Sequence, residues 1–211
     1  MAVNRNGGNR PTGKVGNVVI RELNGQVVTS GLGERTKPFT DKEVKNHSRM
    51  DLVNQLLRPV KEFIKVGFHQ VTEGTTLNYQ NYAVHINNPG ALKLDGADVE
   101  IDYSKAIFSK GKMPAIAHAD IKVIDEGVEF SWDPTWKIKG IKDSDRVMLL
   151  ALCPSKETAY FVLDGNKRSS GIDAVEILHF NEKVILQTYL AFIAADRKSI
   201  STIIYTGEIL Y

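Results

Sequence analysis

The sequence predicts a mixed, mostly β protein in three parts. An extended arm with a β-hairpin is expected over residues 1–38, a kinked helical segment over 39–96 and a β-sandwich over 97–211. Three observations carry this prediction. They are an Asn-Gly pair between two β-branched runs, a helix start signal followed by apolar residues at helical spacing, and strict alternation from about residue 97.

The composition is that of an ordinary globular protein. The chain has 211 residues, of which 42% are hydrophobic and 25% are charged, and it has one cysteine. These values exclude a collagen, a disulfide scaffold and a mostly disordered chain. Cys153 lies in an apolar run and is expected to be a buried structural thiol.

The start of the chain predicts synthesis in the cytoplasm without a signal peptide. The stretch Met1–Gly8 has no apolar core of the kind that a secretory signal needs. No apolar run approaches the roughly 18 residues that span a bilayer, so no membrane span is expected.

The net charge of +2 hides an asymmetry along the chain. Residues 1–70 hold 12 Lys/Arg and 6 Asp/Glu, whereas residues 71–211 hold 15 and 19. A basic front and an acidic back indicate either a polyanionic partner for the front or contact with the back of a neighbouring copy.

The first 16 residues are expected to form an arm that is either disordered or ordered by what it binds. Their Gly, Pro and Asn content leaves little apolar surface to offset the entropy of ordering. The segment Gly13–Gly16 lacks the spacing of a phosphate-binding loop. Its glycines indicate instead backbone that lies close to another backbone.

A hairpin follows the arm. Asn24-Gly25 separates the runs Asn17–Leu23 and Gln26–Ser30, and this dipeptide favours the tight turn that joins two antiparallel strands. A two-stranded hairpin is marginally stable in water, and its edges are open to pairing. We therefore expect this hairpin to pack against something else.

The helical segment has a complete N-terminal signal. Thr40 is the expected N-cap, Glu43 completes a capping box, and Phe39 with Val44 makes a hydrophobic staple. Pro59 is expected to kink the helix or to start a second one. The expected buried residues are Met50, Val53, Leu56, Leu57, Val60, Phe63 and Ile64.

Two further features complete the helical segment. Gly67 is expected to cap its C-terminus. Residues 75–88 favour a short helix, and Asn87–Gly90 is expected to end it.

The rest of the chain alternates between apolar and polar residues, with turn residues at the breaks. Short strands at regular spacing are typical of a β-sandwich. The expected strands are 99–103, 121–123, 128–132, 146–153, 158–163, 173–178, 184–194 and 201–209.

Residues 104–210 resemble an immunoglobulin-like or fibronectin type III sandwich. Val128–Pro134 resembles the second strand with its core Trp and the following Pro turn, and Thr188–Phe192 resembles the sixth strand with its corner tyrosine. The absence of a Cys pair between the sheets suits the fibronectin type III variety. The fold class implied is thus a mixed, mostly β chain that ends in an Ig-like sandwich.

The whole chain also resembles an uncharacterised family that is common in Bacteroidota genomes and has a Gly-Lys-Val-Gly-Asn N-terminal arm. The resemblance implies the same two-part fold and no activity. The segments that carry it are Gly13–Val19, Leu57–Pro59, Ile64–Phe68, Ile101–Lys105, Leu163–Gly171 and Tyr189–Phe192.

No motif predicts catalysis, a cofactor or a metal centre. The five histidines are scattered, without the pair spacing of a zinc site. Asp133, Asp143 and Asp145 suggest either a Ca²⁺ site or solvated loop charge, and the basic residues among them favour loop charge. No base pairs recognisably with Ser155 or with Ser169-Ser170.

The first functional hypothesis is a non-enzymatic structural protein that self-assembles, as a component of a virion, tail or surface fibre. The expected partners are further copies of the chain, in an oligomer or filament, and other structural proteins. Strand addition to a neighbour would satisfy the backbone of the arm. The expected interface residues are Arg10, Gly13, Lys14, Val15, Gly16, Val18, Val19, Ile20, Arg21, Val27 and Val28.

Two other hypotheses stay open. The sandwich is also typical of modules that bind surface glycans or proteins, and Tyr79, Tyr82, Trp136 and Tyr160 suggest either a carbohydrate surface or core aromatics. The basic arm is compatible with a nucleic-acid-associated protein, although it lacks an aromatic for base stacking before Phe39. Nucleic acid is therefore the less favoured partner.

Overall fold

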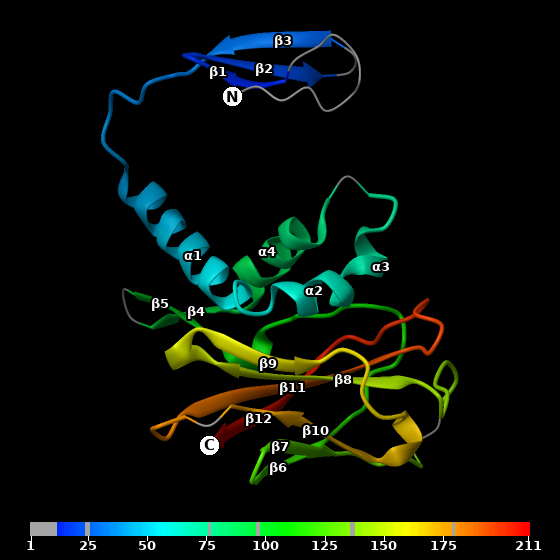
Figure 1. Cartoon of the computed structure of the whole chain (residues 1–211). Coiled ribbons are helices and arrows are strands. Elements are labelled where there is room, and N and C mark those ends of the chain that lie inside the picture. Colours follow the sequence, from blue (N-terminus) through cyan, green and yellow to red (C-terminus); the bar gives the residue numbers. More distant parts are fainter. Residues whose placement is uncertain (1–11, 24–25, 76, 96–97, 136–137, 179) are drawn as a thin grey trace. The chain divides into compact units, whose positions relative to one another are not determined.

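The computed structural model is mixed and mostly β, as the sequence predicts (Figure 1). It describes residues 12–211 apart from 24–25, 76, 96–97, 136–137 and 179. Over these residues it has twelve strands in four sheets and four α-helices. The chain divides into two compact units. The first unit ends at Glu43, and the second runs from Val44 to Tyr211.

The first unit contains a three-stranded antiparallel sheet. Strand β1 (Gly13–Val15) pairs with β2 (Val18–Leu23), and β2 pairs with β3 (Gln26–Gly31). The pairing of β2 with β3 confirms the predicted hairpin, whose turn at Asn24-Gly25 lies outside the described residues. Irregular backbone follows from Leu32 to Thr40.

The expected arm is wrong for Gly13–Val15, which form a strand. The reason is local, because Gly16 has a φ of 57° and so takes the left-handed conformation that turns the chain back within two residues. Close backbone approach does not explain this glycine, since no atom lies within 4 Å of a Cβ built there. Residues 1–11 of the expected arm lie outside the described residues.

The second unit is built around two antiparallel sheets with a common core. All seven strands lie within three residues of the positions that the alternation predicts. The four-stranded sheet contains, in spatial order, β12 (Ile204–Leu210), β11 (Ile185–Ile193), β8 (Arg146–Cys153) and β9 (Thr158–Val162). The three-stranded sheet contains β10 (Ile172–Glu176), β7 (Gly127–Ser131) and β6 (Asp120–Ile124).

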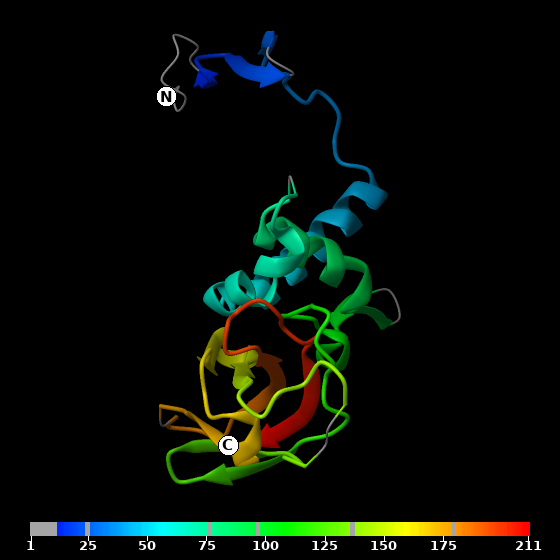
Figure 2. The ribbon, with the colours of Figure 1, turned by 90° about the vertical axis from the view of Figure 1, so that its right-hand side faces the viewer.

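The helices of this unit lie on the outer face of the four-stranded sheet, opposite β6 and β7 (Figure 2). The unit therefore has three layers, a helical layer, the four-stranded sheet and the three-stranded sheet. The helices are α1 (Asp41–Leu57), which enters the unit at Val44, α2 (Lys61–Gly67), α3 (His69–Thr72) and α4 (Tyr79–Gly90).

Strands β8 and β11 are buried along almost their whole length. Their alternate side chains enter two different cores. Leu149 and Phe192 face the three-stranded sheet, where the rings of Trp132 and Phe192 meet at 5.4 Å. Leu150 faces the helical layer together with Tyr189.

The core against the helices contains several aromatic rings. The ring of Phe63 from α2 meets Phe161 of β9 edge-on at 6.0 Å, and Phe108 meets Tyr189 at 4.9 Å. The Tyr189 hydroxyl donates to the carbonyl of Tyr103 at 2.8 Å, and burial raises its pKa well above the ordinary value. This bond joins β11 to a segment before the sandwich, so Tyr189 is not the corner tyrosine that the resemblance implied.

Residue 97, where the predicted sandwich begins, lies inside the second compact unit. Strands β4 (Leu92–Asp95) and β5 (Asp98–Ile101) form a separate hairpin, and the sandwich begins at β6. The helical layer buries one face of the four-stranded sheet, so the core extends across this position.

Three details of the helices sharpen or correct the prediction. Pro59 lies in the break between α1 and α2, and the second helix begins at Lys61 rather than at Pro59 itself. Gly67 is the last residue of α2 and is needed for close packing, because a Cβ there would lie 2.1 Å from the Phe108 carbonyl oxygen. The helix ends within the expected stop Asn87–Gly90, at its last residue, so α4 includes these residues before it ends.

The buried side chain of Asn87 accounts for this extension. Its amide donates to the carbonyls of Ala83 and Ile107, and its oxygen accepts from the Ile107 N–H. These bonds anchor the last turn of α4 to the segment after the β4–β5 hairpin. The turn therefore tolerates Pro89, which lacks an N–H to donate.

The three-layer arrangement predicts that a change in the helical layer destabilises the sandwich. Phe63→Ala removes a fully buried ring and is expected to lower the free energy of unfolding by about 3–5 kcal/mol. Chemical denaturation, followed by circular dichroism and by Trp fluorescence, should show one shifted transition with both probes. Val123→Ala, at a half-exposed site on β6, is the control. Separate transitions would contradict the shared core.

Candidate functional site

The sheet of the first unit has one apolar face and one polar face. The strand register decides which residues share a face, because directly paired residues point the same way. The more apolar face carries Val15, Val18, Ile20, Val27 and Thr29, with Glu22 at the register position paired with Val27, and the more polar face carries Lys14, Val19, Arg21, Val28 and Ser30. The expected interface residues are thus brought onto one small sheet, divided between two faces. Arg10 lies outside the described residues.

No described residue of the first unit covers the apolar face. Val15 is 53% exposed and Val27 is 46% exposed, whereas Val18 and Ile20 are half-buried among their neighbours. None of the side chains described in this unit is buried. A small sheet normally needs a packed face for stability. This sheet therefore has the chemistry of a surface that packs against something else.

The edges of the sheet are also available. In the described structure β3 pairs with β2 alone, so alternate residues of this six-residue strand present unpaired backbone groups along the outer edge. Such an edge is a template for an added strand. Among the described strands, β1 alone covers the other edge of β2, and it is short.

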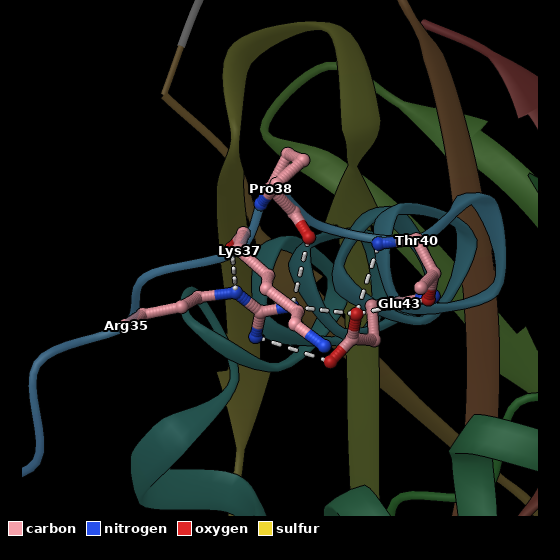
Figure 3. Close-up of polar contacts among 5 residues, drawn as sticks. All are labelled: Arg35, Lys37, Pro38, Thr40 and Glu43. Atoms are coloured by element: carbon pink, nitrogen blue, oxygen red, sulfur yellow. Dashed lines mark hydrogen bonds and ion pairs between the residues drawn. The ribbon is translucent and has the colours of Figure 1, made fainter.

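A network around Arg35 shapes the segment between the sheet and α1 (Figure 3). The guanidinium donates to both carboxylate oxygens of Glu43, at 2.7 and 3.1 Å, and to the carbonyls of Lys37 and Pro38, at 2.8 and 3.2 Å. Its central carbon lies 4.1 Å from the centre of the Phe39 ring. Residues 35–39 thus wrap around one side chain.

The same carboxylate completes the predicted capping box, which the structure confirms. Glu43 accepts from the Thr40 N–H at 2.9 Å, and the Thr40 hydroxyl accepts from the Glu43 N–H at 3.4 Å. The sequence alone did not identify Arg35 as a partner. Its contacts depend on how the irregular segment turns.

The charge asymmetry is distributed differently from the prediction. Residues 1–43 hold seven Lys/Arg and four Asp/Glu, and residues 44–70 hold five and two. Half of the basic excess of the front therefore belongs to the helices of the second unit. Lys14 and Arg21 share the polar face of the sheet, so the described sheet is amphipathic rather than uniformly basic.

The other candidate sites do not assemble in the described residues. Asp145 is buried beside Arg168, and Asp133 accepts from the hydroxyl of Thr135, which lowers the pKa of that carboxyl. Cys153 is buried, as predicted. No group of three or more His, Cys, Asp or Glu within the described ranges is arranged to hold a metal ion.

The aromatic residues proposed for a carbohydrate surface lie in different places. Tyr79 and Tyr82 pack in the helical layer, where Tyr82 meets Phe68 at 5.3 Å. Tyr160 packs with the core between the sheets. Trp136 lies outside the described residues. The three described tyrosines therefore do not form one flat binding surface.

A buried ion pair is the main polar feature that the sequence did not reveal. Arg168 Nε lies 3.7 Å from an Asp145 oxygen, and both side chains are almost fully buried. The guanidinium carbon lies 3.6 Å from the centre of the Phe192 ring. Burial lowers the pKa of Arg168 to about 10, although the charge of Asp145 opposes this shift. No local sequence pattern marks these two residues as partners.

The pair joins the start of β8 to the loop before β10. Asp145 accepts from the Lys142 N–H at 2.8 Å, and the Arg168 N–H donates to the Asp145 carbonyl at 2.7 Å. The Arg168 carbonyl accepts from the Trp132 indole at 2.8 Å. These contacts are structural, because every partner belongs to the sandwich itself.

The fold and the surface together define a class of protein: a mostly β chain with a layered second unit and a small amphipathic sheet in its first unit. Family of unknown function (DUF6266) matches residues 10–207, and the chain belongs to this family. The predicted membership of an uncharacterised family is thereby confirmed. No curated protein and no solved structure matches the chain. Within the described residues, no helix combines the length and the apolarity needed to cross a membrane.

The ion pair predicts a specific pattern of stability. Arg168→Met leaves Asp145 buried without a cation and is expected to cost about 3–5 kcal/mol of unfolding free energy. The double variant that adds Asp145→Asn should be more stable than this single variant, because it removes the uncompensated charge. Urea denaturation of both variants measures the difference. A double variant less stable than Arg168→Met would contradict the pairing.

The Arg35 network predicts local order at the start of α1. Glu43→Ala removes the carboxylate of the capping box and is expected to destabilise the first turn by about 1 kcal/mol. Amide hydrogen exchange in residues 41–45 should then be about fivefold faster. Lys37→Ala is the matched control, since the network uses only the carbonyl of Lys37. Equal exchange rates in Glu43→Ala and Lys37→Ala would contradict the role of the Glu43 carboxylate in the capping box.

Proposed function

We propose that this chain is a non-enzymatic structural protein that self-assembles through the sheet of its first unit. The observation that carries this proposal is an apolar face that none of the described residues covers, with Val15 and Val27 about half exposed. Fully burying a valine contributes about 1.5–3 kcal/mol, so several such side chains provide a substantial driving force for association. A component of a virion, tail or surface fibre would use a contact of this kind.

The open edge of β3 supports the same proposal. A neighbouring strand that adds to this edge would satisfy its backbone groups, and the apolar face would gain a cover in the same contact. If the partner surface is a different part of the chain, the contact is heterologous. Repeated heterologous contacts form rings or filaments.

We also infer that the sandwich is of the immunoglobulin or fibronectin type III kind. The strand order supports this inference, since β6, β7 and β10 share one sheet and β8, β9, β11 and β12 share the other. A sandwich with three strands in one sheet and four in the other, in this strand order, suits the fibronectin type III variety. The Bacteroidota origin of the family stays a prediction. Fold alone assigns no function, so the proposal rests on the first unit.

The second candidate function is a binding module that uses the sandwich. One observation favours a protein partner, because Ile185 and Leu210 form a directly paired cross-strand couple and are 51% and 57% exposed. Two adjacent apolar side chains are a small patch by the standard of known interaction sites. A full-length Ile185→Ser variant that keeps its assembly but loses a partner would favour this function.

Two adjacent valines test the self-assembly proposal. Val27→Glu places a charge on the apolar face, whereas Val28→Glu places the same charge on the polar face of the same strand. Light scattering of the full-length protein over a range of concentrations should show an oligomer for the natural chain and for Val28→Glu. It should show a monomer for Val27→Glu. A natural chain that is monomeric at every concentration would overturn the proposal.

A further inference from the structure

The outer edge of β3 presents a regular row of backbone groups. The Leu32 N–H donates to the Asn17 carbonyl at 2.7 Å, so these two residues form a hydrogen-bonded pair at one end of the β2–β3 ladder. Bonded and non-bonded pairs alternate along an antiparallel ladder, and the register of β2 with β3 has no shift. The backbone groups of Val27, Thr29 and Gly31 therefore point away from β2.

The strand β3 lacks the features that protect an edge from pairing. Natural edge strands are commonly blocked by charged side chains, by Pro or by a bulge. Residues 26–31 include no charged residue and no Pro, and their pairing with β2 is regular. Val27 and Val28 are 46% and 40% exposed. This edge is therefore open to another strand.

The other described edge strands differ from β3. A charged residue occurs in each of β1, β4, β5, β6, β10 and β12. The strand β9 is also uncharged, but it belongs to the second unit, where it lies beside β10 of the facing sheet. Among the described edges of the first unit, β3 is thus the uncharged one.

A second copy of β3 complements this edge. Two β3 strands related by a two-fold axis run antiparallel, as the strands within the sheet already do. If Thr29 lies opposite Thr29 of the second copy, Val27 lies opposite Gly31 of that copy. All the outward residues of both strands then face one another in hydrogen-bonded pairs. A single contact would satisfy the open edges of both copies.

Building on the proposed function, we propose that β3 pairs antiparallel with β3 of a second copy, about a two-fold axis at Thr29. The contact joins two sheets into one and places both apolar faces on the same side, because directly paired residues point the same way. No charge lies across the new seam, where Val28 is opposite Ser30 of the other copy. The contact is isologous, so it closes as a dimer and leaves the joined apolar face for larger assemblies.

Disulfide trapping between co-expressed full-length copies tests the proposed register. One copy carries Val28→Cys and one tag, and the other carries Ser30→Cys and a second tag. The register makes these positions a directly opposite pair with Cα atoms about 4.5 Å apart, which a disulfide can bridge. Cys153 stays in place because it is buried. Mild oxidation should produce a dimer that contains both tags on a non-reducing gel.

Two controls make the trapping specific. In either variant alone, the two new cysteines are diagonal neighbours about 7–8 Å apart, beyond the usual reach of a disulfide. Val28→Cys with Val123→Cys is the second control, since Val123 lies on β6 in the second unit. Each control should yield at least tenfold less dimer. Equal trapping in either control would overturn the assigned pairing.

A backbone variant tests the edge itself. Adding Thr29→Pro to both trapping variants removes an outward N–H, and an edge strand tolerates Pro where its N–H faces solvent. It should lower the yield of mixed dimer at least tenfold. Thr29→Ala keeps the N–H and should leave the yield unchanged. Equal yields with Thr29→Pro and Thr29→Ala would overturn the pairing through this edge.

Light scattering of the natural chain separates this inference from the proposed function. An oligomer that is lost with Val27→Glu, together with no mixed dimer from Val28→Cys and Ser30→Cys, would retain self-assembly and overturn the β3 pairing. A natural chain that is monomeric at every concentration would overturn both.

Discussion

The double-sided burial of strands β8 and β11 is the constraint on which the second unit depends. Each strand has one row of side chains in the core between the sheets and another row in the core under the helices. Burying both rows removes a large apolar area from water, which is the main favourable contribution to folding. The four-stranded sheet therefore needs both the helices on one face and the three-stranded sheet on the other.

Polar contacts then fix how these layers join. The Tyr189 hydroxyl connects β11 to Tyr103 under the helical layer, and Asn87 connects α4 to Ile107. On the other side of the sheet, Arg168 and Asp145 connect the loop before β10 to β8. Each of these buried groups has its bonding partner far along the chain. The apolar surfaces make the layers pack, and these hydrogen bonds and the ion pair specify one arrangement of the layers.

The first unit follows the opposite principle. Its sheet has the alternation of a packed sheet, but the apolar face carries no cover in the part of the unit that the structure describes. The contacts of Arg35 order the segment after the sheet without burying it. A chain that folds one unit around a full core and leaves another with an open face is suited to association, which is the basis of the proposed function.

The sequence by itself determined the local elements, because their signals are contained in a few neighbouring residues. The capping box at Thr40 correctly identified the start of α1. The alternation of apolar and polar residues correctly identified the strands of the sandwich. Only the tertiary structure decided the three layers, the turn of Gly13–Val15 into the sheet and the pairing of Arg168 with Asp145. These features depend on which residues meet across long separations, and periodicity reports that a side chain is apolar but not which surface covers it.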